Sequence, residues 1–203
     1  MKKNLEDYVF VMPLLNQKIC NKVIEELQNV KWKTHTFYAH RDRKSETVSN
    51  GDDLDSSYEA IPSDNIIMKG IWKAIHKYIV ENLKFPWFPG WEGYTSLKYN
   101  RYNKNKLMAE HCDHIHDMFE GKVRGIPILT VLVSLNNNYK GGELILFQNK
   151  EYKLNSGEVI IFPSNFLYPH KVMPVTEGTR YTCISWVYLS LIHISEPTRL
   201  GMI

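Results

Sequence analysis

The stretch that decides the fold is TVLVSLNNNYKGGELILF, residues 130–147, followed closely by LNSGEVIIFP, residues 154–163. Each contains apolar runs of strand length, and the Gly-Gly and Ser-Gly pairs between the runs are turn signals. The sequence therefore predicts at least three short strands here, connected by tight turns, in a mainly β protein.

Downstream, FLYPHKVMPVTEGTRYTCISWVY, residues 166–188, extends the same pattern. We expect one strand to end at His170, a turn around Glu177 and Gly178, and a return strand. Alternate residues of a strand share a face, so Arg180, Thr182, Ile184 and Trp186 are predicted to point the same way.

A metal site is predicted from HCDHIHD, residues 111–117. His111 and Asp113 are two residues apart, so on a strand they would bind one metal from the same face, and His170 is the expected third ligand. Two imidazoles and one carboxylate that leave positions open are typical of non-haem Fe(II) oxygenases. His114 and His116 are expected to contact solvent or the ligands instead of the metal.

The cysteine content argues against a structural zinc site. The chain has three cysteines, Cys20, Cys112 and Cys183, and no CxxC pair. Structural zinc usually needs a closed, Cys-rich tetrahedron, so iron is the preferred metal.

Arg180 lies ten residues after His170 on a largely apolar face. A buried guanidinium needs an anionic partner, and a carboxylate fits its planar donors. A metal-bound dicarboxylate would be such a partner. The alternatives are a structural ion pair with Glu143 or Glu158, or an exposed arginine.

Residues 95–188 resemble the Fe(II)/2-oxoglutarate-dependent dioxygenases, specifically the prolyl 4-hydroxylase-like branch. The matching features, in order, are Tyr102, the HxD of His111 and Asp113, Thr130 to Leu135, Gly141-Gly142-Glu143, Gly157-Glu158, His170 and Arg180. The resemblance implies a double-stranded β-helix, or jelly roll, of the cupin type.

The same resemblance implies that His111, Asp113 and His170 bind Fe(II), and that 2-oxoglutarate chelates the metal and directs its far carboxylate to Arg180. With O2, and with ascorbate as a candidate reductant, the enzyme would release succinate and CO2 and hydroxylate an unactivated C–H. A protein side chain such as proline is the preferred substrate. Because Asp113 is retained, hydroxylation is expected over halogenation.

Two positions depart from the family pattern. Ser134 stands where many relatives have a tyrosine that binds the far carboxylate of 2-oxoglutarate, so Tyr102 and Thr182 are predicted to substitute for it. Met108 stands where prolyl hydroxylases often have a tyrosine.

Other functions remain open. A non-redox cupin-like metal protein or an interaction module would not require Arg180. Small-molecule or nucleobase substrates are further alternatives. The nucleobase dealkylases typically carry a second arginine six residues after the first, where this chain has Trp186.

Residues 1–189 are expected to form one domain, with helical support over about 1–94 and the jelly-roll core over about 95–189. Apolar periodicity predicts an N-terminal helix after an Asn16 cap and a second helix from Asp64 to about Leu83, capped by Ser63. Both helices should pack on one sheet. Residues 39–60 are polar and are expected to be a long loop near the site, with Arg41, Arg43 and Lys44 as substrate contacts.

The formal charge of +3, with no run of five basic residues, argues against nucleic acid as the partner. No signal peptide or membrane span is predicted, and the unpatterned cysteines favour a reducing, cytoplasmic compartment. The oligomeric state has no sequence signal. Residues 190–203 resemble vector read-through and are excluded from the interpretation.

Overall fold

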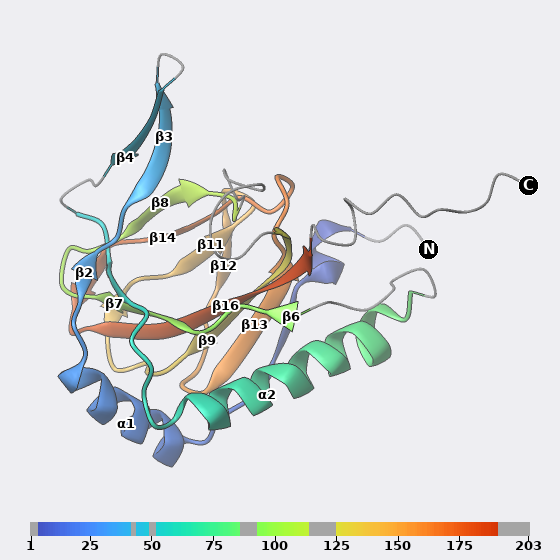
Figure 1. The fold of residues 1–203 in the computed structure, drawn as a ribbon, viewed down its shortest axis with the longest axis horizontal. Helices are drawn as coiled ribbons and strands as arrows, with labels where there is room; N and C mark the ends of the chain where they lie inside the picture. Colours follow the sequence, from blue (N-terminus) through green and yellow to red (C-terminus); the bar gives the residue numbers. More distant parts are fainter. Residues whose placement is uncertain (1–3, 42–43, 49–51, 86–92, 114–124, 191–203) are drawn as a thin grey trace, which may run out of the picture.

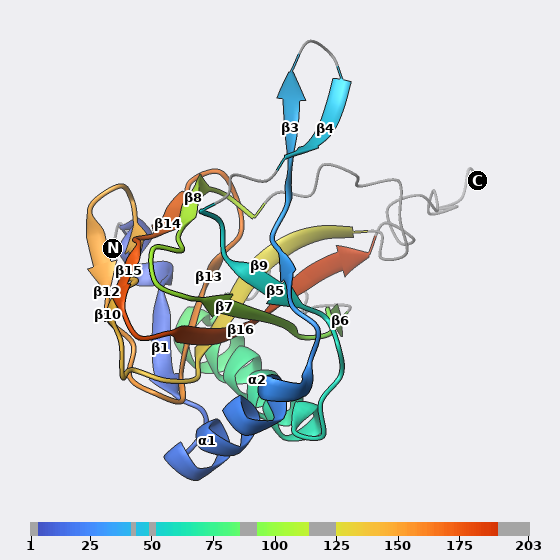
Figure 2. The same cartoon turned by 90° about the vertical axis from the view of Figure 1, so that its left-hand side faces the viewer.

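The computed structural model describes residues 4–41, 44–48, 52–85, 93–113 and 125–190 (Figure 1). Three layers lie on top of one another: two helices, a large antiparallel sheet and a smaller sheet (Figures 1 and 2). The mainly β jelly roll with flanking helices that the sequence predicted is therefore confirmed.

The large sheet has eight strands and forms the centre of the molecule. Seven are hydrogen-bonded in the order β1 (Phe10–Pro13), β13 (Glu158–Pro163), β9 (Gly125–Ser134), β16 (Arg180–Ser190), β7 (Lys98–Tyr102), β5 (Asp55–Ser57) and β2 (Lys33–Thr34), and β6 (Gly93–Tyr94) pairs with β16. Strands far apart in sequence are thus neighbours, as a jelly roll requires.

The smaller sheet carries two of the three predicted metal ligands. Its order is β12 (Lys150–Tyr152), β11 (Leu144–Leu146), β14 (His170–Val172) and β8 (Met108–His111). Two further pairs complete the strands: β10 (Lys140–Gly141) with β15 (Val175–Glu177), and β3 (Phe37–Arg41) with β4 (Lys44–Val48).

Apolar residues of the central strands alternate between two cores. On β9, Val131 and Val133 pack toward the helices, whereas Leu132 packs toward the smaller sheet. On β13, Ile161 and Ile160 divide in the same way. Since both faces are covered, these strands are apolar at nearly every position.

Both predicted helices form and pack on the large sheet. α1 (Gln17–Glu26) continues as a short 3-10 helix, Leu27–Asn29, and a further 3-10 turn, Leu5–Tyr8, precedes β1. α2 (Asp64–His76) runs into a π-helical segment, Lys77–Leu83. The stripe of isoleucines along this helix, Ile67, Ile71, Ile75 and Ile79, is buried against the sheet.

One predicted helix cap is confirmed and the other is wrong. The Asn16 side chain accepts a hydrogen bond from the Ile19 amide at 3.0 Å. Ser63 does not cap α2 with its side chain, because its hydroxyl and its amide both donate to the Glu26 carboxylate, each at 3.0 Å. Ser63 instead joins the start of α2 to the end of α1.

Two other expectations need correction. The segment expected to be a loop, residues 39–60, contains most of the β3–β4 hairpin, which projects from the body of the molecule (Figure 2), and also β5. His170 begins β14 instead of ending a strand. Neither α1 nor α2, nor any other helix in the described ranges, is long and apolar enough to cross a membrane.

Candidate metal centre

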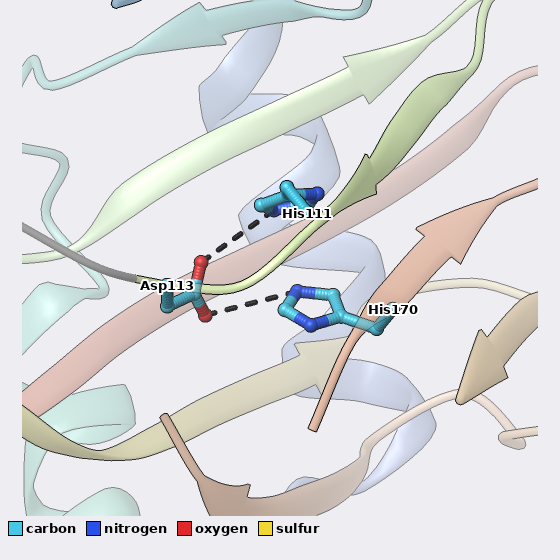
Figure 3. Close-up of side chains that lie close together, drawn as sticks. All are labelled: His111, Asp113 and His170. Carbon is cyan, nitrogen blue, oxygen red and sulfur yellow. Dashed lines mark ion pairs between the residues drawn. The ribbon is translucent and has the colours of Figure 1, made fainter. Parts of the chain in front are cut away.

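The two histidines of the centre come from neighbouring strands of the smaller sheet. His111 ends β8 and His170 begins β14, and the two residues are register partners in this antiparallel pair. Asp113 lies just beyond the end of β8, so the prediction that His111 and Asp113 lie on one strand is wrong. The chain turns after His111 and brings the carboxylate to both imidazoles (Figure 3).

The three side chains form a compact cluster. Oδ1 of Asp113 lies 3.5 Å from Nε2 of His111, and Oδ2 lies 3.7 Å from Nε2 of His170. One ligand atom from each residue can be chosen so that all lie within 4.8 Å of one another. This spacing leaves room for one metal ion among them.

Backbone carbonyls set the orientation of both imidazoles. Nδ1 of His111 lies 2.8 Å from the Ala109 carbonyl oxygen, and Nδ1 of His170 lies 3.1 Å from that of Tyr168. Because a carbonyl only accepts, each Nδ1 must carry the proton. The Nε2 lone pairs are then free for a metal, which is how ligating histidines are usually held.

The carboxylate is held as well. The buried Thr130 hydroxyl donates to Oδ2 of Asp113 at 2.6 Å and lies 2.8 Å from the Ser164 hydroxyl, which must then donate to it. Burial raises the pKa of Asp113, but in the metal-free site a hydrogen bond from His111 and the charges of His170 and His111, when these are protonated, and the hydrogen bond from Thr130 outweigh that effect and leave the pKa well below its usual range. Asp113 is therefore an anion, and two imidazoles with one carboxylate fit Fe(II).

A cavity of about 350 Å³ opens beside this cluster. The three clustered residues line it, together with the β7 residues Lys98, Asn100 and Tyr102 and with apolar side chains from both sheets. Met108, which departs from the family pattern, is also in the lining. The metal centre thus lies at the wall of a pocket between the two sheets.

Arg180 lies in the interior at the start of β16. Its side chain is buried, and Nε and Nη1 have no hydrogen-bond partner in the described structure. None of the ion pairs among the described residues involves it, so neither an exposed arginine nor an ion pair with Glu143 or Glu158 is found. A buried guanidinium with two unpartnered nitrogens and no ion pair is costly unless an anion binds it.

Arg180 is not among the residues that line the metal cavity, although the sequence predicted that it binds the same co-substrate as the metal. Its guanidinium lies 4.8 Å from the centre of the Tyr102 ring, and it lines a separate cavity of about 270 Å³. Tyr102 lines the metal cavity and pairs with Arg180 across β7 and β16. Burial raises the pKa of the Tyr102 phenol, and the charge and hydrogen bond of Arg180 offset part of that effect.

The residues around Arg180 include the other predicted co-substrate contacts. Thr182 is buried two residues further along β16, and its Oγ1 has no partner among the described residues. Its register partners are Asn100 on one side, whose Oδ1 is also unpartnered, and Ser134 on the other. Ser134 is itself satisfied, since its hydroxyl donates to the Asn136 carbonyl at 3.0 Å.

No contact among the described residues places the predicted substrate-binding residues at the cavity. Arg41 and Lys44 pair at the tip of the β3–β4 hairpin and are described only as backbone, and Arg43 lies outside the described residues. His114 and His116 also lie outside the described residues. So do residues 191–203, which make up most of the segment excluded as non-native.

Sequence reasoning missed two polar residues of the cavity. Lys98 is buried in the wall, and its Nζ lies 3.2 Å from Nδ1 of His35. Strand alternation from Tyr102 back to Lys98 could have identified the lysine as an inward residue. No local signal could have identified His35, which reaches the cavity from a distant segment.

Comparison with known families gives a match over the region that contains the site. Residues 97–188 match the 2OG-Fe(II) oxygenase superfamily. The predicted resemblance to Fe(II)/2-oxoglutarate-dependent dioxygenases is therefore confirmed over these residues, which make up just under half of the chain.

Similar sequences come from bacterial hydroxylases. A PKHD-type hydroxylase of Prochlorococcus marinus (strain MIT 9312) is 39% identical over 89 residues, which is 42% of this chain and 39% of that protein. A PKHD-type hydroxylase of Delftia acidovorans is 36% identical over 109 residues, 51% of this chain and 47% of that protein. The matched region thus spans less than half the length of these curated relatives.

Solved structures show the same fold. A prolyl hydroxylase from Trichoplax adhaerens, in complex with a hypoxia inducible factor peptide fragment, superposes with a TM-score of 0.64 at 18% identity, covering 90% of this chain and 84% of that one. A Pseudomonas putida prolyl-4-hydroxylase gives a TM-score of 0.60 at 13% identity, covering 90% and 92%.

Proposed function

We propose that this chain is an Fe(II)- and 2-oxoglutarate-dependent dioxygenase that hydroxylates an unactivated C–H of a protein side chain such as proline. The observation that carries the proposal is the cluster of His111, Asp113 and His170, in which both imidazoles present Nε2 and the carboxylate is ionised. The match to the 2OG-Fe(II) oxygenase superfamily over the same region supports it.

In this proposal the three residues would hold Fe(II), and the site would admit 2-oxoglutarate and O2. The bound metal supplies oxidative decarboxylation of 2-oxoglutarate to succinate and CO2, coupled to hydroxylation of the substrate. His111 and His170 are held by backbone carbonyls, and Thr130 orients Asp113. The residues therefore need little rearrangement when the metal binds. Ascorbate is retained as a candidate reductant.

Arg180 is proposed to bind the far carboxylate of 2-oxoglutarate. Its unpartnered Nε and Nη1 atoms support this role, since buried donors normally have acceptors. The unpartnered Thr182 hydroxyl and the Tyr102 phenol lie nearby and are proposed to assist. Because Tyr102 stands between Arg180 and the metal cavity, its side chain would have to share the carboxylate or turn aside.

A peptide is the preferred substrate. The Trichoplax adhaerens prolyl hydroxylase was solved with a bound peptide fragment, and it has the fold of this chain. Arg41, Arg43 and Lys44 are proposed to contact the substrate, because Arg41 and Lys44 pair in a projecting hairpin that follows His35 and Thr36 of the cavity wall. A small-molecule substrate is the second candidate, since the described cavity is small and mostly apolar in its lining.

The test is a direct search for the hydroxylated product. Purified protein with Fe(II), 2-oxoglutarate, ascorbate and O2 would be incubated with a library of proline-containing peptides, and products analysed by mass spectrometry for the gain of one oxygen atom. Succinate formation should rise with a true substrate. If no 2-oxoglutarate is consumed under any condition, the proposed reaction class is wrong; if it is consumed without peptide oxidation, only the peptide assignment fails.

A further inference from the structure

Lys98 is the only lysine or arginine among the described residues that line the metal cavity. The residue is 6% exposed, and its Nζ lies 3.2 Å from Nδ1 of His35 and 6.0 Å from the centre of the Trp186 ring. No carboxylate of a described residue forms an ion pair with it. A buried ammonium without an anionic partner is costly and calls for a function.

The ammonium keeps its charge and has donors to spare. Burial lowers the pKa of Lys98 to about 8, partly offset by Asp113, so the group is largely protonated at neutral pH. Burial and the charge of Lys98 lower the pKa of His35 to about 4, so His35 is neutral and its Nδ1 accepts from Lys98. An ammonium has three donors, and this contact uses one.

The co-substrate proposed above cannot be the partner of both cations. Residues of an antiparallel strand rise about 3.4 Å each, so Lys98 and Tyr102 lie about 14 Å apart along β7. Arg180 pairs with Tyr102, whereas Lys98 pairs with Ile184. A dicarboxylate that chelates the metal through one end has only one carboxylate left, so binding at Arg180 leaves Lys98 unpaired.

The charges of the loaded site lead to the same conclusion. The positive charges of Fe(II), Arg180 and Lys98 exceed the negative charges of Asp113 and a 2-oxoglutarate dianion by one. Glu110 also lines the cavity, but it is exposed to water, which screens its charge. One further anionic group would therefore balance the charge of the loaded site. Other residues that line the cavity, such as Leu54 and Ile184, are apolar.

We propose that Lys98 binds a carboxylate of the primary substrate, so that the enzyme selects a compact apolar group that carries an acid close to the oxidised carbon. This inference rests on the proposed function and adds the substrate class to it. Lys98 contacts the substrate through a charge-assisted hydrogen bond, and His35 positions the ammonium.

The test compares acids with their amides. Protein loaded with Fe(II) and 2-oxoglutarate would be titrated without O2, by calorimetry, with L-proline and L-prolinamide, with N-acetyl-L-proline and its amide, and with peptides that carry Glu or Gln after proline. The first two pairs test a carboxylate next to the ring, and the peptides test one on a neighbouring side chain. At least one acid should bind about 10- to 100-fold more tightly than its amide.

Three variants separate the outcomes. Lys98→Met should abolish the preference for the acid, Lys98→Arg should keep most of it, and the exposed control Lys69→Met should not change it. The affinity for 2-oxoglutarate should be the same in Lys98→Met and wild type. Equal binding of acid and amide by wild type, retention of the preference by Lys98→Met, or a loss of 2-oxoglutarate affinity in that variant would each overturn the inference.

A separate control distinguishes a wrong role for Lys98 from a wrong proposed function. If the wild type forms no visible charge-transfer band with Fe(II) and 2-oxoglutarate, the proposed function fails and the inference with it. If the band forms but acids and amides bind equally, only the role of Lys98 is wrong.

Discussion

His111 and His170 are directly paired across the antiparallel strands β8 and β14, and their ring centres lie 4.3 Å apart. Residues opposite each other in such a pair keep their side chains on one face of the sheet. The sheet register therefore holds the two imidazoles together, and only Asp113 depends on the path of the following chain.

His170→Ala should abolish metal binding, because it removes one of three proposed ligands. Without O2, wild type with Fe(II) and then 2-oxoglutarate should develop a visible charge-transfer band that the variant lacks. The matched control is His76→Ala, which removes an exposed histidine at the end of α2. An unchanged band in His170→Ala would rule out the assigned metal centre.

Thr130→Val should weaken the metal site without removing a ligand. The change keeps the shape of the side chain but deletes the 2.6 Å hydrogen bond to Asp113. Loss of such a supporting contact typically lowers metal affinity by about 10- to 100-fold. The Fe(II) affinity of Thr130→Val would be compared with that of Thr176→Val, where the threonine is exposed. Equal affinities would show that Thr130 does not support the carboxylate.

Arg180→Met should separate co-substrate binding from metal binding. Fe(II) affinity should persist, whereas the dissociation constant of 2-oxoglutarate should rise by about 10- to 100-fold through loss of a charge-assisted contact. The control is Arg101→Met, because Arg101 pairs with Asp55 at 3.0 Å. If 2-oxoglutarate binds Arg180→Met as tightly as wild type, another residue anchors it.

Lys98→Met should change stability in a pH-dependent way. The pKa of Lys98 is about 8 in the folded protein, below its ordinary 10.5, because of burial. Between these pH values the unfolded chain binds more protons than the folded protein. The free energy of unfolding of the wild type therefore increases as pH rises. The methionine variant lacks this effect.

The variant should therefore be more stable than wild type at pH 7, with a difference that shrinks by roughly 3 kcal/mol as pH rises from 8 through 10.5 and beyond. Urea unfolding of the metal-free proteins measures it, and Lys69→Met should show no such trend. A difference between Lys98→Met and wild type that stays constant with pH would contradict the buried charge.

Gly157→Ala should destabilise the sheet by more than about 3 kcal/mol. Gly157 has φ +82°, and an added Cβ would clash with the Leu15 carbonyl oxygen. This close approach lets the Gly157 carbonyl accept from the amides of Leu14 and Leu15, next to the β1–β13 pair. Urea unfolding would measure the loss.

The control is Gly70→Ala, because the nearest atoms at Gly70 belong to the flexible Leu14 side chain at 3.1 Å. Alanine is favoured over glycine in a helix by about 1 kcal/mol, which offsets the tighter contact, so a small change is expected there. Comparable losses in the two variants would mean that the backbone conformation of Gly157 is not the cause.

The sequence by itself determined the apolar strands within residues 130–188, the two helices and the three residues of the metal cluster. These features depend on local periodicity and on short spacings: apolar runs bounded by glycines, isoleucines repeated every four residues, and a His-x-Asp pair. Such patterns constrain the backbone within one element, so they can be interpreted without knowing which elements become neighbours.

Only the tertiary structure decided how side chains from distant segments meet. It moved Asp113 off the strand, placed Tyr102 between Arg180 and the metal cavity, and joined His35 to Lys98. These relationships depend on strand register and on the path of the chain after each strand, which arise from packing between residues far apart in sequence. For that reason the metal cluster was predictable, whereas the contact between His35 and Lys98 was found only in the folded protein.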